Sequence, residues 1–316
     1  MKKCVGVDLG GTTVKIGILC EDGTISEKWE IPTRKEEGGK YILGDIAASI
    51  REHLAAAGLN LQEMAGVGIG VPGPVQSSGY VEVCVNLGWK DINPAAELSK
   101  LMGGVPVKAG NDANVAALGE FWKGGGQGCE NIVFVTLGTG VGGGIIVEGR
   151  LLHGTHGSGA ELGHMVLDPR ETAVCGCGKR GCVEQYCSAT GIVRLAKLRL
   201  DKDEAASSLR ALTDLTCRDI FDAGKAGDAV ALEILDQYYD YMGQFLGSVC
   251  SAVDPEAVVI GGGVSKAGHV LLEGIEPYFH KYVFHAASQV RFALASLGND
   301  AGAYGAFKLA VDAFAK

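Results

Sequence analysis

The feature of this 316-residue sequence that most constrains its fold is a pattern of glycine-ended strands that occurs twice in the same order. In the first half, the apolar segment Cys4–Asp8 passes through a glycine turn into a second strand, Val14–Cys20. Ile132–Leu137 and Gly144–Val147 repeat this arrangement on either side of Gly138-Thr139-Gly140. Two short apolar runs joined by a glycine turn are typical of a hairpin. Each half is therefore predicted to begin with one.

Two further pairs of segments extend the duplication. The strand Val67–Val71 runs into Pro72-Gly73-Pro74, and its counterpart Val258–Ile260 also runs into glycines. Gly110-Asn111-Asp112-Ala113 precedes a helix, as does Gly298-Asn299-Asp300-Ala301. The offset is 128 residues for the first pair of strands and 191 and 188 for the later pairs. The second half therefore carries an insertion of about sixty residues, which begins after its hairpin.

Two α/β halves related in this way are expected to face each other across a cleft in which ligands bind. Gly124-Gly125-Gly126 marks the boundary between a domain at 1–123 and a domain at 124–298, and the last helix, at about 299–316, returns to the first domain. The other segments expected to be regular are the strands Ile25–Ile31 and Val105–Ala109, the helices Ile42–Ala57 (before Gly58) and Asn114–Lys123, and two helices of the insertion, around Ile192–Leu200 and Asp228–Val253.

The composition excludes several classes of protein. Hydrophobic residues make up 47% of the chain and charged residues 21%, so a large core is expected and disorder is not. A net charge of -9 argues against binding to nucleic acid or to an anionic membrane. The 10 cysteines follow no secretory signal, so they are expected as thiols or metal ligands in a cytoplasmic protein. Small molecules or other subunits are the expected partners.

A metal-ligand pattern lies inside the insertion. Four side chains that bind zinc follow the spacing H-x10-C-x-C-x4-C, namely His164, Cys175, Cys177 and Cys182. Three thiolates and one imidazole complete a tetrahedral shell and leave no position for water, which predicts a structural Zn²⁺. The spacers Gly176, Gly178 and Gly181 would let the loop bend through positive φ. Buried free cysteines are the alternative.

Two carboxylates flank this cluster. Glu161 and Glu184 each lie within three residues of a ligand, so the metal is expected to hold both in place for a bound molecule. A solvated pair of glutamates is the alternative. His153 and His156 are expected to be loop residues, and Cys187 a packing residue.

The glycine motifs predict phosphate binding but not a dinucleotide fold. Gly138–Gly143 satisfies G-x-G-x-x-G, yet that fingerprint requires a following helix, and here a strand follows. The sequence also lacks G-x-x-x-x-G-K-[ST]. A hairpin turn rich in N–H groups still binds phosphate, and Asp8–Thr13 forms a similar turn. Either turn alone could be free of ligand, but two on opposite sides of a cleft favour phosphate.

Three aspartates at strand ends could carry chemistry. Asp8 would hold Mg²⁺ beside nucleotide phosphates, or else stabilise its turn. Asp112 would be the base that accepts a proton from a substrate hydroxyl, or else an ordinary helix N-cap. Asp300 occupies the equivalent place in the second half, and the sequence leaves the choice between the two open.

Taken together, these motifs resemble the ROK family of sugar kinases and repressors. The resemblance extends from Val5 to the last helix and rests on D-L-G-G-T-T-V-K-I-G, E-L-G-H-M and C-G-C-G-K-R-G-C-V-E-Q-Y. V-N-L-G-W-K, G-N-D-A-N, V-T-L-G-T-G-V-G-G-G-I-I and G-G-G-V-S-K-A-G are similar to the ATP-dependent glucokinases of that family.

The resemblance implies an actin-like (ribonuclease H-like) pair of α/β domains that close on sugar and ATP, with Asp112 as the base. The implied sugar residues are Gly73, Asn86, Asn111, Asp112, Glu161, His164 and Glu184. The implied nucleotide and Mg²⁺ residues are Asp8, Gly10, Gly11, Thr12, Thr13, Lys15, Gly138, Thr139, Gly140, Gly262 and Gly263. His164 would serve both the zinc and the sugar through its two ring nitrogens.

The expected reaction is ATP plus D-glucose giving ADP plus glucose 6-phosphate. A related kinase for fructose, mannose or an N-acetylhexosamine is the nearest alternative, and polyphosphate stays open as a donor. A DNA-binding repressor of the same family is disfavoured, because the first strand begins by Cys4 and leaves no room for an N-terminal winged helix. A non-catalytic sugar sensor is the third alternative. A homodimer or larger homo-oligomer is the family expectation.

Overall fold

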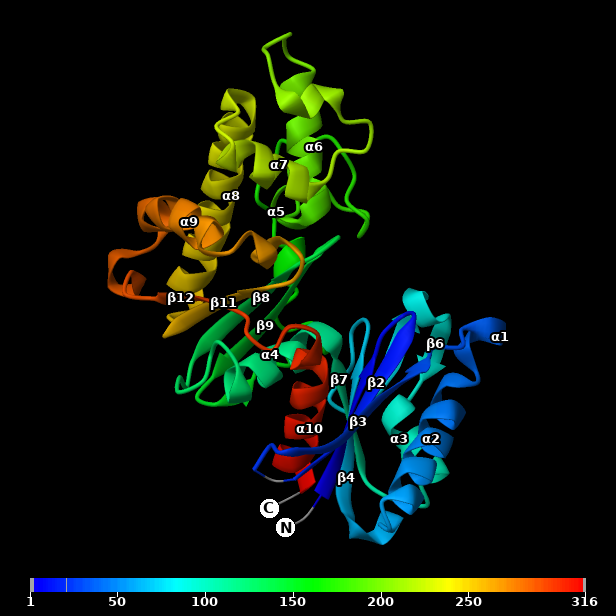
Figure 1. Ribbon diagram of the computed structural model, residues 1–316. Helices are drawn as coiled ribbons and strands as arrows, with labels where there is room; N and C mark the ends of the chain where they lie inside the picture. Colours follow the sequence, from blue (N-terminus) through cyan, green and yellow to red (C-terminus); the bar gives the residue numbers. More distant parts are fainter. Residues whose placement is uncertain (1–2, 21, 315–316) are drawn as a thin grey trace.

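The computed structural model describes residues 3–20 and 22–314, which contain two five-stranded sheets with the same strand order. The orders are β3-β2-β1-β4-β7 and β10-β9-β8-β11-β12. In each sheet the middle strand pairs antiparallel with its hairpin partner on one side and parallel with the strand on its other side. Figure 1 shows the first sheet in the lower part of the molecule and the second above it. The predicted duplication is confirmed.

The central strands of both sheets are almost continuously apolar because helices cover both of their faces. The first sheet consists of β1 (Lys3–Leu9), β2 (Thr13–Cys20), β3 (Ile25–Pro32), β4 (Met64–Val71) and β7 (Val107–Asn111). The second consists of β8 (Ile132–Leu137), β9 (Val141–Val147), β10 (Arg150–Leu151), β11 (Ala257–Gly261) and β12 (Arg291–Leu294). A separate hairpin, β5 (Val81–Cys84) and β6 (Trp89–Ile92), lies beside the first sheet.

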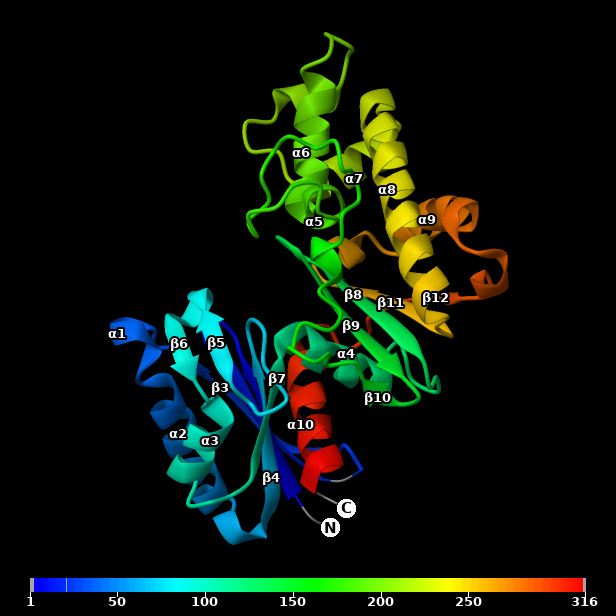
Figure 2. The same ribbon diagram turned by 180° about the vertical axis from the view of Figure 1, so that it is seen from behind.

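Alternate residues of the first sheet face different helices, as the period of a strand requires. Val5 and Val67 belong to the core cluster that includes the apolar face of α2 (Ile42–Ala56), while Cys4 packs with Phe307 on the opposite face. Figure 2 shows α2 and α3 (Pro94–Leu101) together on the outer side of this sheet. The short α1 (Glu36–Gly39) precedes them.

The insertion and the segment after β11 form the helical layer of the second half. Their helices are α5 (Glu184–Cys187), α6 (Ala189–Leu200), α7 (Cys217–Lys225), α8 (Ala229–Val253) and α9 (His269–Tyr282). The two predicted insertion helices are confirmed as α6 and α8, whereas α5, α7 and α9 were not predicted. Over residues 3–20 and 22–314, no helix has both the length and the apolar character needed to cross a membrane.

Helices α4 (Asp112–Lys123) and α10 (Ala301–Phe314) occupy equivalent places in the duplication and pack against each other between the two sheets (Figures 1 and 2). Their backbones approach closely at two glycines. A Cβ atom at Gly119 would lie 2.2 Å from the carbonyl oxygen of Ala301, and one at Gly305 would lie 1.6 Å from that of Val115. Only glycine fits at these two positions, so the helix pair fixes how the halves meet.

Several predicted boundaries are wrong by a few residues. The last strand of the first sheet spans Val107–Asn111 instead of Val105–Ala109, since Pro106 has no N–H to donate to a ladder. Helix α4 begins at Asp112, two residues before the expected start. Strand β9 begins at Val141, which leaves only Gly138–Gly140 in the turn. β12 ends at Leu294, whereas the match between the two halves predicts a strand over Arg291–Leu297.

The helix contact generates a test of the fold. We expect Gly119→Ala to lower the free energy of unfolding by about 1–3 kcal/mol or more, because the added methyl group meets a backbone oxygen that cannot move alone. Gly44→Ala is the matched control, since Gly44 is exposed in α2 and a Cβ there meets no atom within 4 Å. Urea denaturation would measure both. Equal stability of Gly119→Ala and the parent protein would contradict the close contact.

Candidate active site and metal centre

Two cavities lie at the junction of the two halves, and they share three lining residues. The first, of about 730 Å³, is named the carboxylate cavity, and its lining includes all the predicted sugar residues: Gly73, Asn86, Asn111, Asp112, Glu161, His164 and Glu184. The second, of about 610 Å³, is named the glycine cavity and is lined by Asp8, Lys15, residues 261–263 and residues 298, 299, 301 and 302, among others. Asp112, Ala113 and Thr136 line both.

Asp112 is the first residue of α4, but it does not cap the helix. The cap is Asn111, whose Oδ1 accepts the N–H of Asn114 at 3.0 Å. The interpretation of Asp112 as an ordinary N-cap is therefore wrong. Its Oδ1 accepts the N–H of Ala113 at 2.8 Å, and the side chain lines both cavities.

The surroundings of Asp112 disfavour its charged form. Although the side chain stays open to the cavities, enclosure of the carboxyl group at the junction of the two halves raises its pKa to about 6, against the lowering effect of the Ala113 N–H, and the nearby carboxylates Asp8 and Glu161 add to the rise. A pKa of about 6 suits a general base, because the group is mostly deprotonated at neutral pH yet still accepts a proton readily.

Asp300, the counterpart of Asp112, takes a different position. Its Oδ1 lies 2.5 Å from Nζ of Lys28, and Asp300 lines neither cavity although its neighbours Asn299 and Ala301 line the glycine cavity. The geometry thus distinguishes two residues that the sequence could not. Of these two aspartates, Asp112 lines both cavities and Asp300 lines neither.

Glu184 is fixed between the hairpin turn of the second sheet and the cysteine loop. Its Oε2 accepts the N–H of Val141 at 3.0 Å, and its Oε1 lies 3.8 Å from Sγ of Cys175. A Cβ at Gly140 would lie 2.1 Å from the same Oε2, so the turn needs glycine here in order to admit the carboxylate. On the other wall, Nδ2 of Asn111 donates to the Gly73 carbonyl at 3.1 Å.

Glu161 lines the carboxylate cavity and follows a residue with an unusual backbone conformation. Ala160 adopts φ +63°, a left-handed conformation rare for a residue with a side chain. Within the described ranges, the Glu161 carboxylate has no hydrogen bond or ion pair, so both of its oxygens remain available to a ligand. No pattern in the sequence predicts this bend. Ser158, Ala160 and Thr136 line the cavity and were missed.

The glycine cavity is lined by two charged residues of the first sheet, the half-buried Asp8 and Lys15. Burial raises the pKa of Asp8, Lys15 opposes the shift, and Asp300 adds to it. Nζ of Lys15 donates to the carbonyl of Asn299 at 3.0 Å. Gly302 leaves room for the Asp8 carboxyl group, whose carbon would lie 2.4 Å from a Cβ at that position.

The predicted nucleotide residues are divided among several places. Asp8, Lys15, Gly262 and Gly263 line the glycine cavity, while Gly138 and Gly140 line the carboxylate cavity. The first-sheet turn residues Gly10, Gly11, Thr12 and Thr13 line neither cavity, and Thr139 lines a separate cavity of about 560 Å³. Glu120, Ser265 and Lys266 of the glycine cavity were not predicted.

The four predicted metal ligands come together. Donor atoms of His164, Cys175, Cys177 and Cys182 all lie within 4.8 Å of one another. Sγ of Cys177 and Sγ of Cys182 are 3.6 Å apart, too far for a disulfide at about 2.05 Å. Thiolates at about 2.3 Å from a tetrahedral Zn²⁺ would be about 3.8 Å apart. The donor set and its spacing therefore fit zinc.

The loop that carries the cysteines bends at two of the three predicted glycines. Gly178 and Gly181 have φ +84° and +73°, and a Cβ at Gly181 would lie 1.9 Å from the carbonyl oxygen of Asp168. Gly176 does not adopt a positive φ, so the prediction was wrong for that residue. Cys187 is buried in the core, as expected for a packing residue.

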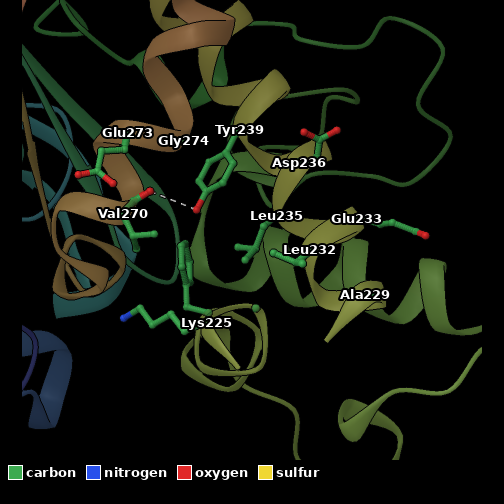
Figure 3. Close-up of a pocket in the computed structure, with 12 residues that line it drawn as sticks. Lys225, Ala229, Leu232, Glu233, Leu235, Asp236, Tyr239, Val270, Glu273 and Gly274 are labelled. Atoms are coloured by element: carbon green, nitrogen blue, oxygen red, sulfur yellow. Dashed lines mark hydrogen bonds between the residues drawn. The ribbon is translucent and has the colours of Figure 1, made fainter. Parts of the chain in front are cut away.

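A further cavity, of about 700 Å³, lies between α7, α8 and α9 (Figure 3). Phe221, Leu235 and Val270 give it an apolar lining, and the hydroxyl of Tyr239 donates to the Val270 carbonyl at 3.3 Å. None of the predicted site residues lines it.

Duplicated α/β halves with paired cavities at their junction define the actin-like class that the sequence predicted. The chain belongs to the ROK family, which matches residues 4–313. It is 42% identical over 313 residues to a glucokinase of Halalkalibacterium halodurans, covering 95% of this chain and 92% of that one.

Solved structures show the same likeness. A ROK hexokinase of Thermus thermophilus has 32% identity and a TM-score of 0.82, with 97% of both chains covered. A ROK family glucokinase of Streptomyces griseus, in complex with glucose and AMPPNP, has 33% identity and a TM-score of 0.75, covering 98% of this chain and 99% of that one.

The cysteine cluster predicts a measurable metal content. We expect the purified protein to hold about one zinc ion per chain, and Cys177→Ala to lose it on dialysis, because three ligands hold zinc less tightly than four. Mass spectrometry of the digested protein would count the metal. Cys20→Ala, a change of a half-buried cysteine outside the cluster, should retain it. Full zinc in Cys177→Ala would exclude this shell.

Proposed function

We propose that this chain transfers the terminal phosphoryl group of ATP to the 6-hydroxyl of D-glucose and releases ADP and glucose 6-phosphate. The observation that carries the proposal is the position of Asp112, which lines both cavities. Phosphoryl transfer requires the acceptor hydroxyl and the donor phosphate to meet in line. A carboxylate at the junction can take the hydroxyl proton as the new bond forms.

The carboxylate cavity is assigned to the sugar. Glu161 and Glu184 offer acceptor oxygens on one wall, and Asn111 retains one N–H after its bond to Gly73. A sugar that lacks the matching hydroxyl would leave a carboxylate unpaired, at a cost of about 1–3 kcal/mol. That difference is enough to discriminate between epimers. Among the possible sugars, we propose glucose because relatives of 36–42% identity are named glucokinases.

The glycine cavity is assigned to ATP. Gly262 and Gly263 would approach the adenosine side, and Lys15 would face the phosphates. Asp8 offers the hard oxygen ligand that Mg²⁺ prefers, and such an ion would neutralise phosphate oxygens when bound. The turns Gly10–Thr13 and Gly138–Gly140 are proposed to donate N–H groups to the phosphates as the halves close.

The zinc site is proposed to be structural and to position the sugar residues. His164 is a ligand, Glu184 lies two residues after Cys182, and its carboxylate contacts Cys175. A closed shell of three thiolates and an imidazole has no position for a reacting water. The metal would therefore hold Glu161 and Glu184 in place without taking part in phosphoryl transfer.

The proposal is tested by a coupled assay of ADP release with ATP and Mg²⁺. The sugar panel contains glucose, mannose, fructose, N-acetylglucosamine and N-acetylmannosamine, and polyphosphate replaces ATP in a parallel series. We expect kcat/KM to be highest for glucose with ATP. Turnover of an N-acetylated sugar instead would reassign the substrate, and glucose binding without turnover would indicate a sensor.

A cytoplasmic location and an assembly of two or more copies remain predictions from the sequence.

Replacing the two equivalent aspartates should have unequal effects. We expect Asp112→Asn to lower kcat by about a hundredfold or more while glucose still binds, because an amide cannot accept the proton. Asp300→Asn should leave kcat within about threefold, since it removes only a half-exposed ion pair with Lys28. Steady-state kinetics and calorimetric glucose titration would measure both. Equal losses in the two variants would contradict the assignment.

The raised pKa of Asp112 predicts an acidic limb in the pH profile. A base must be deprotonated, so kcat/KM should fall about tenfold per pH unit below the pKa of about 6. Measurement from pH 4.5 to pH 8 would show the limb. Its persistence in the residual activity of Asp112→Asn would assign it to another group.

A further inference from the structure

Helix α4 contains a second acidic residue to which the reaction assigns no role. Glu120 has no exposed surface, yet it is among the residues that line the glycine cavity. A buried carboxylate is costly unless hydrogen-bond donors surround it. The hydrogen-bond donors around the Glu120 carboxylate therefore show which segments of the chain it holds in place.

All of its hydrogen bonds in the described ranges come from backbone N–H groups. Oε2 accepts from Gly125 at 2.8 Å and from Ser296 at 3.0 Å, and Oε1 accepts from Leu297 at 2.9 Å. A Cβ at Gly124 would lie 1.9 Å from Oε2, so glycine is needed there to admit the carboxylate. Both oxygens are used as acceptors, and no side chain of the described residues neutralises them.

These bonds join the two segments that connect the halves. Gly125 lies between α4 and β8, and Ser296 and Leu297 lie between β12 and α10. Residues 298, 299, 301 and 302, which directly follow Leu297, line the glycine cavity. Glu120 therefore holds the start of one wall of that cavity against the end of α4.

The same helix carries Asp112 at its other end. Eight residues separate Asp112 from Glu120, a rise of about 12 Å along a helix. Because α4 is a continuous helix, the two ends keep a fixed relation. The position of the glycine-cavity wall is thereby set relative to the base.

We propose that Glu120 is a positioning residue that aligns the ATP-binding wall at residues 298–302 with Asp112. The inference rests on the proposed kinase function, and it assigns ATP affinity to a residue that does not touch the reacting atoms. Loss of the three hydrogen bonds would let this wall drift without changing the carboxylate cavity.

The test compares Glu120→Gln with the parent protein. The amide retains the shape of the side chain, but its NH₂ group would face an N–H donor, so at least one of the three bonds is lost. We expect the Kd for AMPPNP and the KM for ATP to rise about fivefold to a hundredfold. The Kd and KM for glucose should stay within about twofold, since no bond of Glu120 reaches the carboxylate cavity.

Glu256→Gln is the control for the loss of backbone hydrogen bonds to a glutamate, at an exposed residue instead of a buried one. Oε2 of Glu256 accepts the backbone N–H groups of Glu130 at 2.5 Å and Asn131 at 2.7 Å, and the Glu256 carbonyl accepts the N–H of Arg291 at the other end of β12. It lines neither the carboxylate cavity nor the glycine cavity. We expect this variant to lose stability while its AMPPNP affinity stays that of the parent.

Calorimetric binding of AMPPNP separates the outcomes. Parental nucleotide affinity in folded Glu120→Gln would overturn the inference, as would an equal loss in Glu256→Gln or an equal loss of glucose affinity. If Glu120→Gln does not fold, Glu120→Asp retains the charge but shortens the reach to Ser296 and Leu297, and the same criteria apply. A parent protein that binds AMPPNP but phosphorylates no sugar would refute the proposed function and leave the Glu120 result standing.

Discussion

The contact on which the structure depends is the backbone approach of α4 and α10 at Gly119 and Gly305. These helices occupy equivalent places in a duplicated pattern, yet each packs on both its partner and a sheet. Because no side chain separates them, a small shift of one helix must displace the other. The proposed base Asp112, the Glu120 carboxylate and the wall of the glycine cavity all lie on this pair or directly beside it. The halves are therefore joined at the place where the chemistry is proposed to occur.

The site also concentrates negative charge. Asp8, Asp112 and Glu161 interact at the junction of a protein whose net charge is already -9. Burial and the neighbouring carboxylates disfavour the charged form of Asp112, and burial disfavours that of Asp8. A bound cation or a proton relieves that repulsion, and Mg²⁺-ATP would bring the cation. Substrate hydroxyls would supply hydrogen bonds on the sugar side. The carboxylates that would bind the ligands thus repel one another when no ligand is bound, and this repulsion favours binding.

The sequence predicted the duplication, the cleft and the four candidate metal ligands, because strand period, glycine turns and ligand spacing are local signals. The residues Gly73, Asn86 and Asn111 of the carboxylate cavity were implied only by the resemblance to the ROK family, and Thr136, Ser158 and Ala160 of the same cavity were missed. It could not choose between Asp112 and Asp300, since their local sequences are alike and only the pairing of Asp300 with Lys28 separates them. It missed α7 despite a capping box at Thr216 and Asp219, a signal that was present. Glu120 was also missed. Its donors at Ser296 and Leu297 lie more than 170 residues away, and no local pattern reveals such a pairing.

The place of α10 in the first half has a consequence for how the chain is made. Gly6 and Gly68, on the inner face of the first sheet, lie against the backbone of α10 at Ala303 and Ala306. Those residues are synthesised long after the first sheet, because the whole second half lies between them in the sequence. The first sheet therefore emerges with one apolar face uncovered and must wait for the second half and α10 before that face is buried. A nascent chain in which α10 has not yet emerged exposes this surface, so the synthesis of α10, more than that of the first sheet, sets when this half can become native.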